Sequence, residues 1–134
     1  MHTVLLVEDD EMVRSFLSEV LEMYGYGVIT AATATEAVTL CTYVGNSIDM
    51  LISDVSMPDV GGLEFVASIK AISPSLPVLF ISGYDPSDMI EKHRAFITNY
   101  PFLRKPFTTP MLMGTIQQIL AGHGHGARPE QMAS

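Results

Sequence analysis

The chain alternates short apolar runs with longer segments in which apolar residues recur every three or four positions. A short run without polar interruption is typical of a strand that is buried on both faces of a parallel sheet. The third run leads directly into a carboxylate, Asp54. The runs that predict strands are residues 3–7, 28–30, 50–52, 78–81 and 101–104.

The first two segments between these runs predict amphipathic helices. The second helix begins where Thr33 and Glu36 form a capping-box pattern, and it ends near Thr42 or Val44. Cys41 lies at helical spacing with small apolar neighbours, so it is expected to fill the core. The apolar residues that recur along the first helix are Val13, Phe16, Leu17, Val20, Leu21 and Tyr24.

Three further helices are expected. The third follows Gly62 and ends before Ser73, and the fourth begins at Asp85 and Pro86, although its apolar pattern is uneven. The last begins at residues 109–110, and Gly122 is expected to end it. The residues of this last helix that are expected to face inward are Leu112, Ile116, Ile119 and Leu120.

Strands that alternate regularly with helices predict an α/β fold, a doubly wound, five-stranded parallel sheet. Right-handed crossovers leave few topologies, and the flavodoxin-like (βα)5 order 2-1-3-4-5 is the one expected. Residues 1–121 would form one domain, followed by a mobile tail of Gly, His and Pro at residues 122–134. His123 and His125 in this tail lack the rigid support that a metal site needs.

The composition and charge of the chain argue against several classes of protein. The chain of 134 residues is 48% apolar and 16% charged, which fits one folded domain. The net charge of -8 argues against a nucleic-acid-binding surface, which needs clustered Lys and Arg. No apolar run approaches the roughly 20 residues of a membrane span, and the N-terminus lacks a signal-peptide pattern. The single cysteine cannot form an internal disulfide, so a cytoplasmic location is expected.

Charged side chains and one hydroxyl stand at the strand ends that are expected to meet on one edge of the sheet. Glu8 and Asp9 follow the first strand, Asp54 ends the third, Ser82 follows the fourth and Lys105 follows the fifth. Carboxylates gathered this closely repel one another and call for a cation, and Mg²⁺ suits oxygen ligands. A carboxylate can also form an aspartyl phosphate, with the metal, lysine and hydroxyl stabilising the phosphoryl group.

Five separated pieces occur in the same order in a known family. The chain resembles the receiver domain of bacterial response regulators over about residues 3–121, and the variants around residues 82–84 and 101–105 resemble receivers of hybrid sensor kinases. The pieces that carry the resemblance are Val4–Asp10, Asp54, Met57–Gly62, Ser82–Gly83 and Lys105–Phe107.

The resemblance implies a phosphoryl-accepting switch of a two-component phosphorelay, with Asp54 as the phosphoacceptor. Asp9 would bind Mg²⁺ directly, Glu8 would act through water, and the backbone carbonyl of Ser56 would complete the protein ligands. Lys105 would pair with Asp54 and then with the phosphoryl group, and the Lys105-Pro106 bond is expected to be cis.

The same resemblance implies how the switch would work. Ser82 would move toward the phosphoryl oxygens, and Gly83 would leave room for them. The aromatic switch position, often Tyr in the family, is Phe102 here, so it has no hydroxyl and the coupling could be weaker. Ser56 and Tyr84 flank the reaction centre and would tune the phosphoryl lifetime.

The implied partners are a histidine kinase or a histidine phosphotransfer protein, and an unidentified downstream protein. A homodimer through the fourth helix and fifth strand is an open option. The chain is expected to act in its own phosphorylation and dephosphorylation only, not as an enzyme on an outside substrate. No direct contact with nucleic acid or membrane is expected, since the tail is short and not basic.

Three alternatives stay open. An FMN or nucleotide carrier on the same fold would need a phosphate-cradling first turn, which the acidic residues 8–11 oppose. A Mg²⁺-dependent phosphatase with an aspartyl nucleophile would usually place a second Asp where Ser56 stands. A receiver that works as a constitutive adaptor without phosphorylation is the third, although Asp54, Ser82 and Lys105 are all present.

Overall fold

The protein is seen in a computed structural model, which describes residues 2–54, 61–83 and 99–124. Its five strands form one parallel sheet in the order β2-β1-β3-β4-β5, as predicted. The strands lie close to the five apolar runs of the sequence. Their bounds are Thr3–Val7 for β1, Gly27–Ala31 for β2, Met50–Asp54 for β3, Val78–Ser82 for β4 and Phe102–Arg104 for β5.

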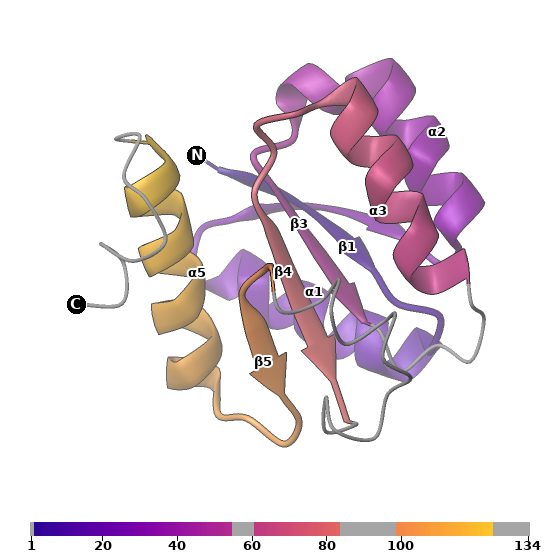
Figure 1. Cartoon of the computed structure of the whole chain (residues 1–134). Coiled ribbons are helices and arrows are strands. Elements are labelled where there is room, and N and C mark those ends of the chain that lie inside the picture. The colour runs from indigo at the N-terminus through magenta and orange to yellow at the C-terminus, as the bar shows by residue number, and fades with distance from the viewer. Residues whose placement is uncertain (1, 55–60, 84–98, 125–134) are drawn as a thin grey trace.

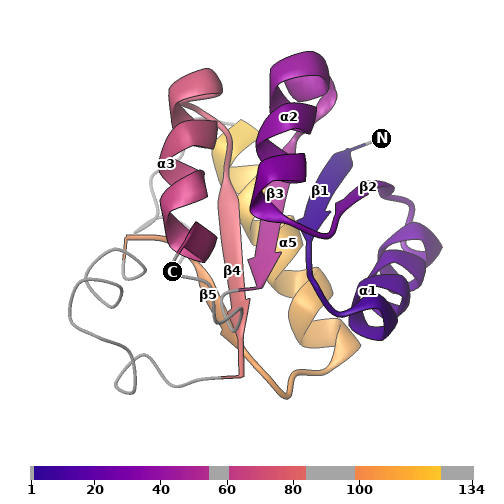
Figure 2. The ribbon, with the colours of Figure 1, turned by 90° about the vertical axis from the view of Figure 1, so that its right-hand side faces the viewer.

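Helices cover both faces of the sheet (Figures 1 and 2). Helices α1 (Glu11–Met23) and α5 (Thr109–Gly124) lie on one face, and helices α2 (Ala34–Val44) and α3 (Gly61–Ile72) lie on the other. A short 3-10 helix, η1 (Gly45–Ser47), follows α2. The helix expected from residue 85 lies outside the described residues. The structure therefore confirms the doubly wound, flavodoxin-like α/β fold.

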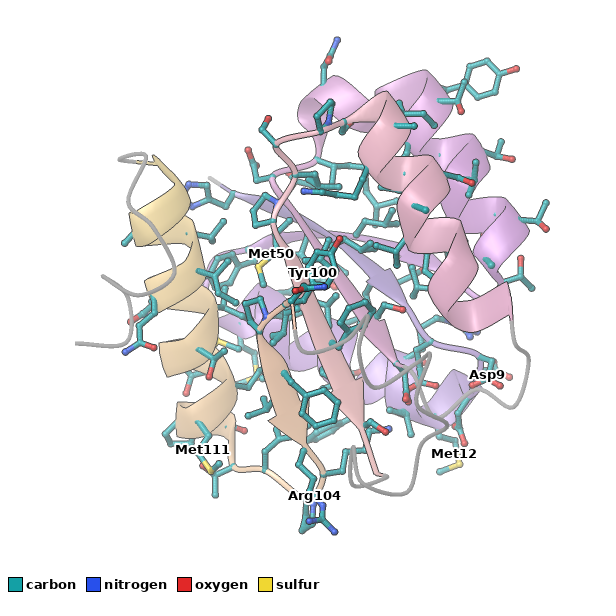
Figure 3. The ribbon with its side chains drawn as sticks, in the orientation of Figure 1. Asp9, Met12, Met50, Tyr100, Arg104 and Met111 are labelled. Atoms are coloured by element: carbon teal, nitrogen blue, oxygen red, sulfur yellow. The ribbon has the colours of Figure 1, made fainter. Side chains whose placement is uncertain are left out.

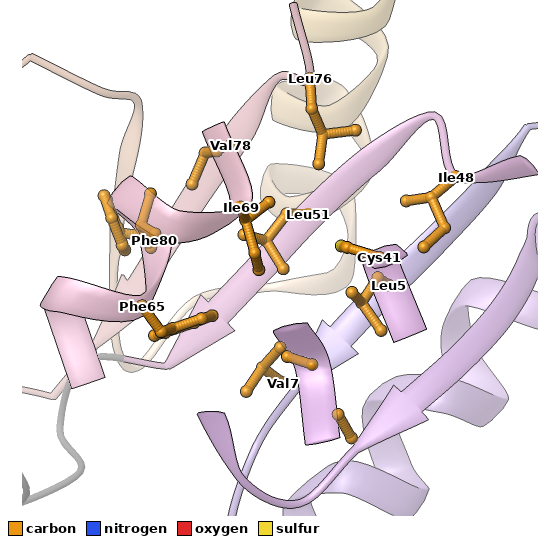
Figure 4. Close-up of a cluster of buried hydrophobic side chains, with 13 residues drawn as sticks. Leu5, Val7, Cys41, Ile48, Leu51, Phe65, Ile69, Leu76, Val78 and Phe80 are labelled. Atoms are coloured by element: carbon orange, nitrogen blue, oxygen red, sulfur yellow. The ribbon is translucent and has the colours of Figure 1, made fainter. Parts of the chain in front are cut away.

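The strands divide their side chains between two cores. Leu5 and Val7 point into the core beneath α2 and α3, shown in Figure 4, whereas Val4 and Leu6 point into the core beneath α1 and α5. This alternation is the two-residue period of a strand, and both faces are apolar because both are covered. Cys41 is 1% exposed within the first core, so its expected packing role is confirmed.

Local signals set the helix starts. The Asp10 side chain caps α1 by accepting a hydrogen bond from the Val13 N–H at 3.1 Å. Thr33 caps α2 in the same way through the Glu36 N–H at 3.1 Å, which confirms the start predicted from the sequence. Helix α1 ends at Met23 and is capped by Tyr24, and the next residue, Gly25, has a φ of 91°, in the left-handed region that favours glycine.

Two sequence predictions about the helices are wrong in part. Phe16 and Tyr24 belong to the apolar pattern of α1, yet they are 59% and 52% exposed, because the sheet surface receives only the narrower stripe around Leu17 and Leu21. Helix α5 continues through Gly122 to Gly124. A glycine inside a helix costs only about 1 kcal/mol, so it does not by itself end one. The division of the chain at residue 121 stays a prediction.

Candidate functional site

The register of the sheet brings the polar strand ends to one edge. Val7 is aligned with Ser53, Asp54 with Ile81, and Ser82 with Arg104. Asp54 is therefore the last residue of a central strand, with Glu8 one position beyond β1 and Lys105 one position beyond β5. The arrowheads in Figure 1 show that these strands end on the same side of the molecule, where Figure 3 places Asp9 and Arg104. This confirms the expected neighbourhood of the strand ends.

Lys105 joins two buried carboxylates. Its Nζ lies 2.6 Å from Asp54 Oδ2 and 3.6 Å from Glu8 Oε1. Asp54 is 4% exposed and Glu8 is 1% exposed, so both carboxylates have lost most of their contact with water. Burial by itself lowers the pKa of Lys105, but the hydrogen bond to Asp54 and the charge of Asp54, together with Glu8, outweigh that effect and raise the pKa. The lysine therefore stays charged beside Asp54.

The Lys105-Pro106 peptide bond is cis, as the resemblance implied. The Lys105 N–H also donates to the carbonyl of Ser82 at 2.7 Å, which extends the β4–β5 hydrogen bonding one residue beyond the strands. The backbone of Lys105 is thus tied to the end of β4, and its side chain is aimed back across that strand toward Asp54.

Glu8 has a strongly raised pKa at this edge of the sheet. Burial raises its pKa from 4.5 to about 8, and its hydrogen bond to Asp54 adds to the effect. Its Oε2 accepts a hydrogen bond from the Asp10 N–H at 3.1 Å. Its Oε1 is buried and has no hydrogen-bond partner among the described residues. A buried acceptor of this kind next to a second carboxylate is suited to a cation or a proton.

The donor chemistry fits Mg²⁺, since the candidate ligands are hard carboxylate oxygens and one buried oxygen, Glu8 Oε1, lacks a hydrogen-bond partner among the described residues. Within residues 2–54, 61–83 and 99–124, however, no three Asp, Glu, His or Cys side chains are gathered closely enough to hold a metal ion. Asp9 is exposed, whereas Glu8 is buried. Ser56, the expected carbonyl ligand, lies outside the described residues. The ligand set of Glu8, Asp9, Asp54 and Ser56 therefore stays a prediction.

The expected switch residues occupy different environments. Ser82 is fully buried at the end of β4. Phe102 is partly buried and packs against the core beneath α2 and α3, which contains Phe80. Phe80 in turn makes an edge-to-face contact with Tyr100, with ring centroids 5.4 Å apart. Tyr84, which was expected to tune the phosphoryl lifetime, lies outside the described residues. The roles of these residues stay predictions.

Arg14 contacts this site although no sequence motif pointed to it. Its Nη1 donates a hydrogen bond to the backbone carbonyl of Glu8 at 2.8 Å. The signal available in the sequence was its spacing, since Arg14 stands one helical turn after Asp10, the cap of α1. The sequence predicts Glu8 and Asp9 as an acidic pair and gives Asp10 no role; in the structure Glu8 is buried, Asp9 is exposed and Asp10 caps α1.

Comparison with known proteins identifies the family. The response regulator receiver domain matches residues 4–117. The chain belongs to the receiver domain family. The match covers the described strands except for Thr3, and it reaches into α5, so it spans all the residues discussed at this edge of the sheet.

Individual relatives agree with this family. Over 118 residues the receiver domain is 33% identical to the sensor kinase CckA of Brucella abortus, covering 88% of this chain and 12% of the kinase. The crystal structure of the receiver domain from the hybrid histidine kinase CckA superimposes with a TM-score of 0.72 at 33% identity, covering 88% of this chain and 98% of that one. A receiver domain protein from Clostridium thermocellum gives a TM-score of 0.78 at 29% identity, with coverage of 90% and 95%.

The chain spans between 12% and 52% of the length of the first curated relatives it matches. A large part of each of those relatives therefore lies outside the matched region. In the part of this chain that the structure describes, none of the helices has the length and apolar character required to cross a bilayer.

Proposed function

We propose that this receiver domain accepts a phosphoryl group on Asp54 from a phosphohistidine of a histidine kinase or a histidine phosphotransfer protein. The observation that supports this most directly is the contact of 2.6 Å between Lys105 Nζ and Asp54 Oδ2, made across the sheet between two strand ends. A lysine held this close to one buried carboxylate is placed to neutralise negative charge that arrives there.

In the proposed reaction an oxygen of Asp54 forms a bond to phosphorus while the bond from phosphorus to the histidine nitrogen breaks. The released imidazole takes up a proton, and Asp54 becomes an aspartyl phosphate. Lys105 holds positive charge beside the acceptor throughout, which favours the phosphoryl oxygens. Bound Mg²⁺, held by Glu8, Asp9, Asp54 and the Ser56 carbonyl, would supply further positive charge to those oxygens.

The proposed output is a change in the face formed by β4 and β5. The charge added at Asp54 attracts the Ser82 hydroxyl, which is buried beside it on the neighbouring strand. Phe102 packs partly into the core next to Phe80, so a movement of Phe102 would change the packing of this face and a partner could detect that change. We propose that a downstream protein, or a second copy of this chain, recognises the altered face. The domain would not act on an outside substrate, and it would work in the cytoplasm.

Membership in the receiver family favours this function over an FMN carrier or a metal-dependent phosphatase. An experiment distinguishes the proposed phosphoryl acceptance from the adaptor alternative, a receiver that is never phosphorylated. Intact mass is measured after incubation with acetyl phosphate, with and without Mg²⁺, for the wild type and Asp54→Ala. The matched control is Asp49→Asn, since Asp49 immediately precedes the same strand at the opposite edge of the sheet.

The proposal predicts a Mg²⁺-dependent gain of one phosphoryl group in the wild type and in Asp49→Asn, and no gain in Asp54→Ala. Circular dichroism should show that Asp54→Ala stays folded, because the substitution removes a buried carboxylate that opposes the ionisation of Glu8. Absence of both phosphorylation and Mg²⁺ binding in the wild type would leave the adaptor as the better account. Unfolding of Asp54→Ala would mean that Asp54 has a structural role instead.

A further inference from the structure

The turn between β1 and α1 holds the acidic pair through its backbone. The Glu8 N–H donates to the carbonyl of Ala31 at 3.0 Å, which continues the β1–β2 pairing. The Glu8 carbonyl accepts a hydrogen bond from Arg14 Nη1 at 2.8 Å. Both backbone groups of Glu8 are thus fixed, one by the sheet and one by a side chain of α1.

The contact with Arg14 also constrains the next residue. The Glu8 carbonyl belongs to the planar peptide unit that contains the nitrogen of Asp9, so fixing the carbonyl fixes the plane from which Asp9 starts. On its other side, Asp9 is followed by Asp10, whose carbonyl accepts the Arg14 N–H at 2.9 Å and whose N–H donates to Glu8 Oε2. Asp9, which is exposed, is therefore held from both sides through Arg14 and Glu8.

Arg14 makes this contact despite the acids around it. Residues 8–11 are all acidic, and in the described part of the chain no ion pair joins Arg14 to any of them. A guanidinium that hydrogen-bonds to a carbonyl among four carboxylates is acting as a geometric restraint as well as a charge. It also lies on the first turns of α1, whose start is already fixed by the Asp10 cap.

From these contacts we infer that Arg14 is a positioning residue for Mg²⁺ binding: it orients the Glu8–Asp9 peptide so that the acidic pair is preorganised for the ion. The inference rests on the proposed function and deepens it. Groups that orient metal ligands typically affect metal affinity by about 10- to 100-fold when they are removed. Arg14 acts through the backbone, so we expect the lower end of that range.

The direction in which Mg²⁺ affinity changes when Arg14 is removed distinguishes a positioning role from a purely electrostatic one. A positive charge close to a cation site weakens cation binding, so removing Arg14 would tighten Mg²⁺ binding if only its charge mattered. If Arg14 positions the acidic pair, its removal weakens binding even though the site becomes more negative. Charge and geometry therefore predict opposite changes in the dissociation constant.

The experiment is a Mg²⁺ titration of the full chain, without phosphorylation, by calorimetry and by NMR of the amides of Glu8, Asp9 and Asp10. Arg14→Ala should raise the Mg²⁺ dissociation constant by about tenfold. Arg14→Lys keeps the charge and one donor, so it should recover part of the affinity. The matched control is Lys70→Ala, since Lys70 Nζ also donates to a backbone carbonyl, that of Leu76 at 2.9 Å, near the opposite edge of the sheet.

Lys70→Ala removes the same charge and a similar hydrogen bond, and its Mg²⁺ affinity should stay within about twofold of the wild type. Unchanged or tighter Mg²⁺ binding by a folded Arg14→Ala would overturn the positioning role while leaving Asp54 phosphorylation intact. If Arg14→Ala does not fold, Arg14→Met decides, since it keeps the aliphatic stem and removes the donor to the Glu8 carbonyl. A Mg²⁺ affinity equal to or tighter than that of the wild type in this variant would overturn the role. Absence of Mg²⁺ binding by the wild type would overturn the proposed function as well.

Discussion

Replacing Glu8 with glutamine should change how the stability of the domain depends on pH. Burial, and then the hydrogen bond to Asp54, raise the pKa of Glu8 from 4.5 to about 8. The folded state therefore binds more protons than the unfolded chain between these two values. Because stability rises with pH only where the unfolded state binds more protons, this group makes stability fall as pH rises through that window. Its favourable contribution is complete below about pH 4.5 and is lost as pH passes 8.

The pKa of Glu8 sets an upper limit on how much the free energy of unfolding changes with pH. A single group with this shift would change the free energy of unfolding by about 4 kcal/mol from pH 5 to 8. Glu8 interacts with Asp54 and lies 3.6 Å from Lys105, so ionisation of Glu8 also changes the energies of those two groups. We expect a loss of about 2–4 kcal/mol in the wild type that is absent in Glu8→Gln. Glutamine mimics the protonated acid and keeps an oxygen for the Asp10 N–H.

The assay is urea unfolding of both proteins at several pH values between 5 and 8, with EDTA present so that no metal contributes. The difference in unfolding free energy between Glu8→Gln and the wild type cancels the carboxylates elsewhere in the chain and reports Glu8 with its coupling to Asp54 and Lys105. As the pH rises, Glu8→Gln should become increasingly more stable than the wild type. A difference that stays constant with pH, or that grows in favour of the wild type, would refute the assignment of a raised pKa to Glu8.

Three further outcomes are expected. Lys105→Met removes the cation shared by Glu8 and Asp54, so the free energy of unfolding at pH 8 should fall by about 2–4 kcal/mol in urea unfolding. A stability equal to that of the wild type would show that Lys105 is not coupled to the two carboxylates in solution. Thr33→Ala removes the side-chain cap of α2, and thermal unfolding should show a loss of about 1 kcal/mol, whereas Thr33→Ser should keep most of it. Tyr100→Leu removes the edge-to-face contact with Phe80 and should cost about 1 kcal/mol, and a double-mutant cycle with Phe80→Leu should give a coupling of similar size if the ring contact is the cause.

The arrangement of elements could be predicted from local sequence patterns. The five apolar runs became the five strands, and the Thr33 pattern started α2 where it was expected. These signals act over at most one helical turn or a few strand residues, so they can be read without knowing the partners. The position of Asp54 at a strand end, on the same edge as Lys105, could also be predicted once the strand order was chosen.

Burial of individual residues could not be predicted from the same patterns. Glu8 and Asp9 are adjacent acids, yet one is 1% exposed and the other lies at the surface. Phe16 and Leu17 are adjacent apolar residues, yet only Leu17 enters the core. Adjacent side chains on a helix or turn point in different directions, and which direction faces the protein depends on how the element sits on the sheet.

The sequence by itself determined the fold class, the order of the polar strand ends and the family pattern, because hydrophobic period, caps and motifs are local properties. The tertiary structure decided the distances and the electrostatics of the site. Lys105 and Asp54 are separated by 51 positions and meet at 2.6 Å, and the raised pKa of Glu8 comes from burial and from Asp54. Such contacts depend on packing across the sheet, since electrostatic interactions act through space and local dielectric rather than along the chain.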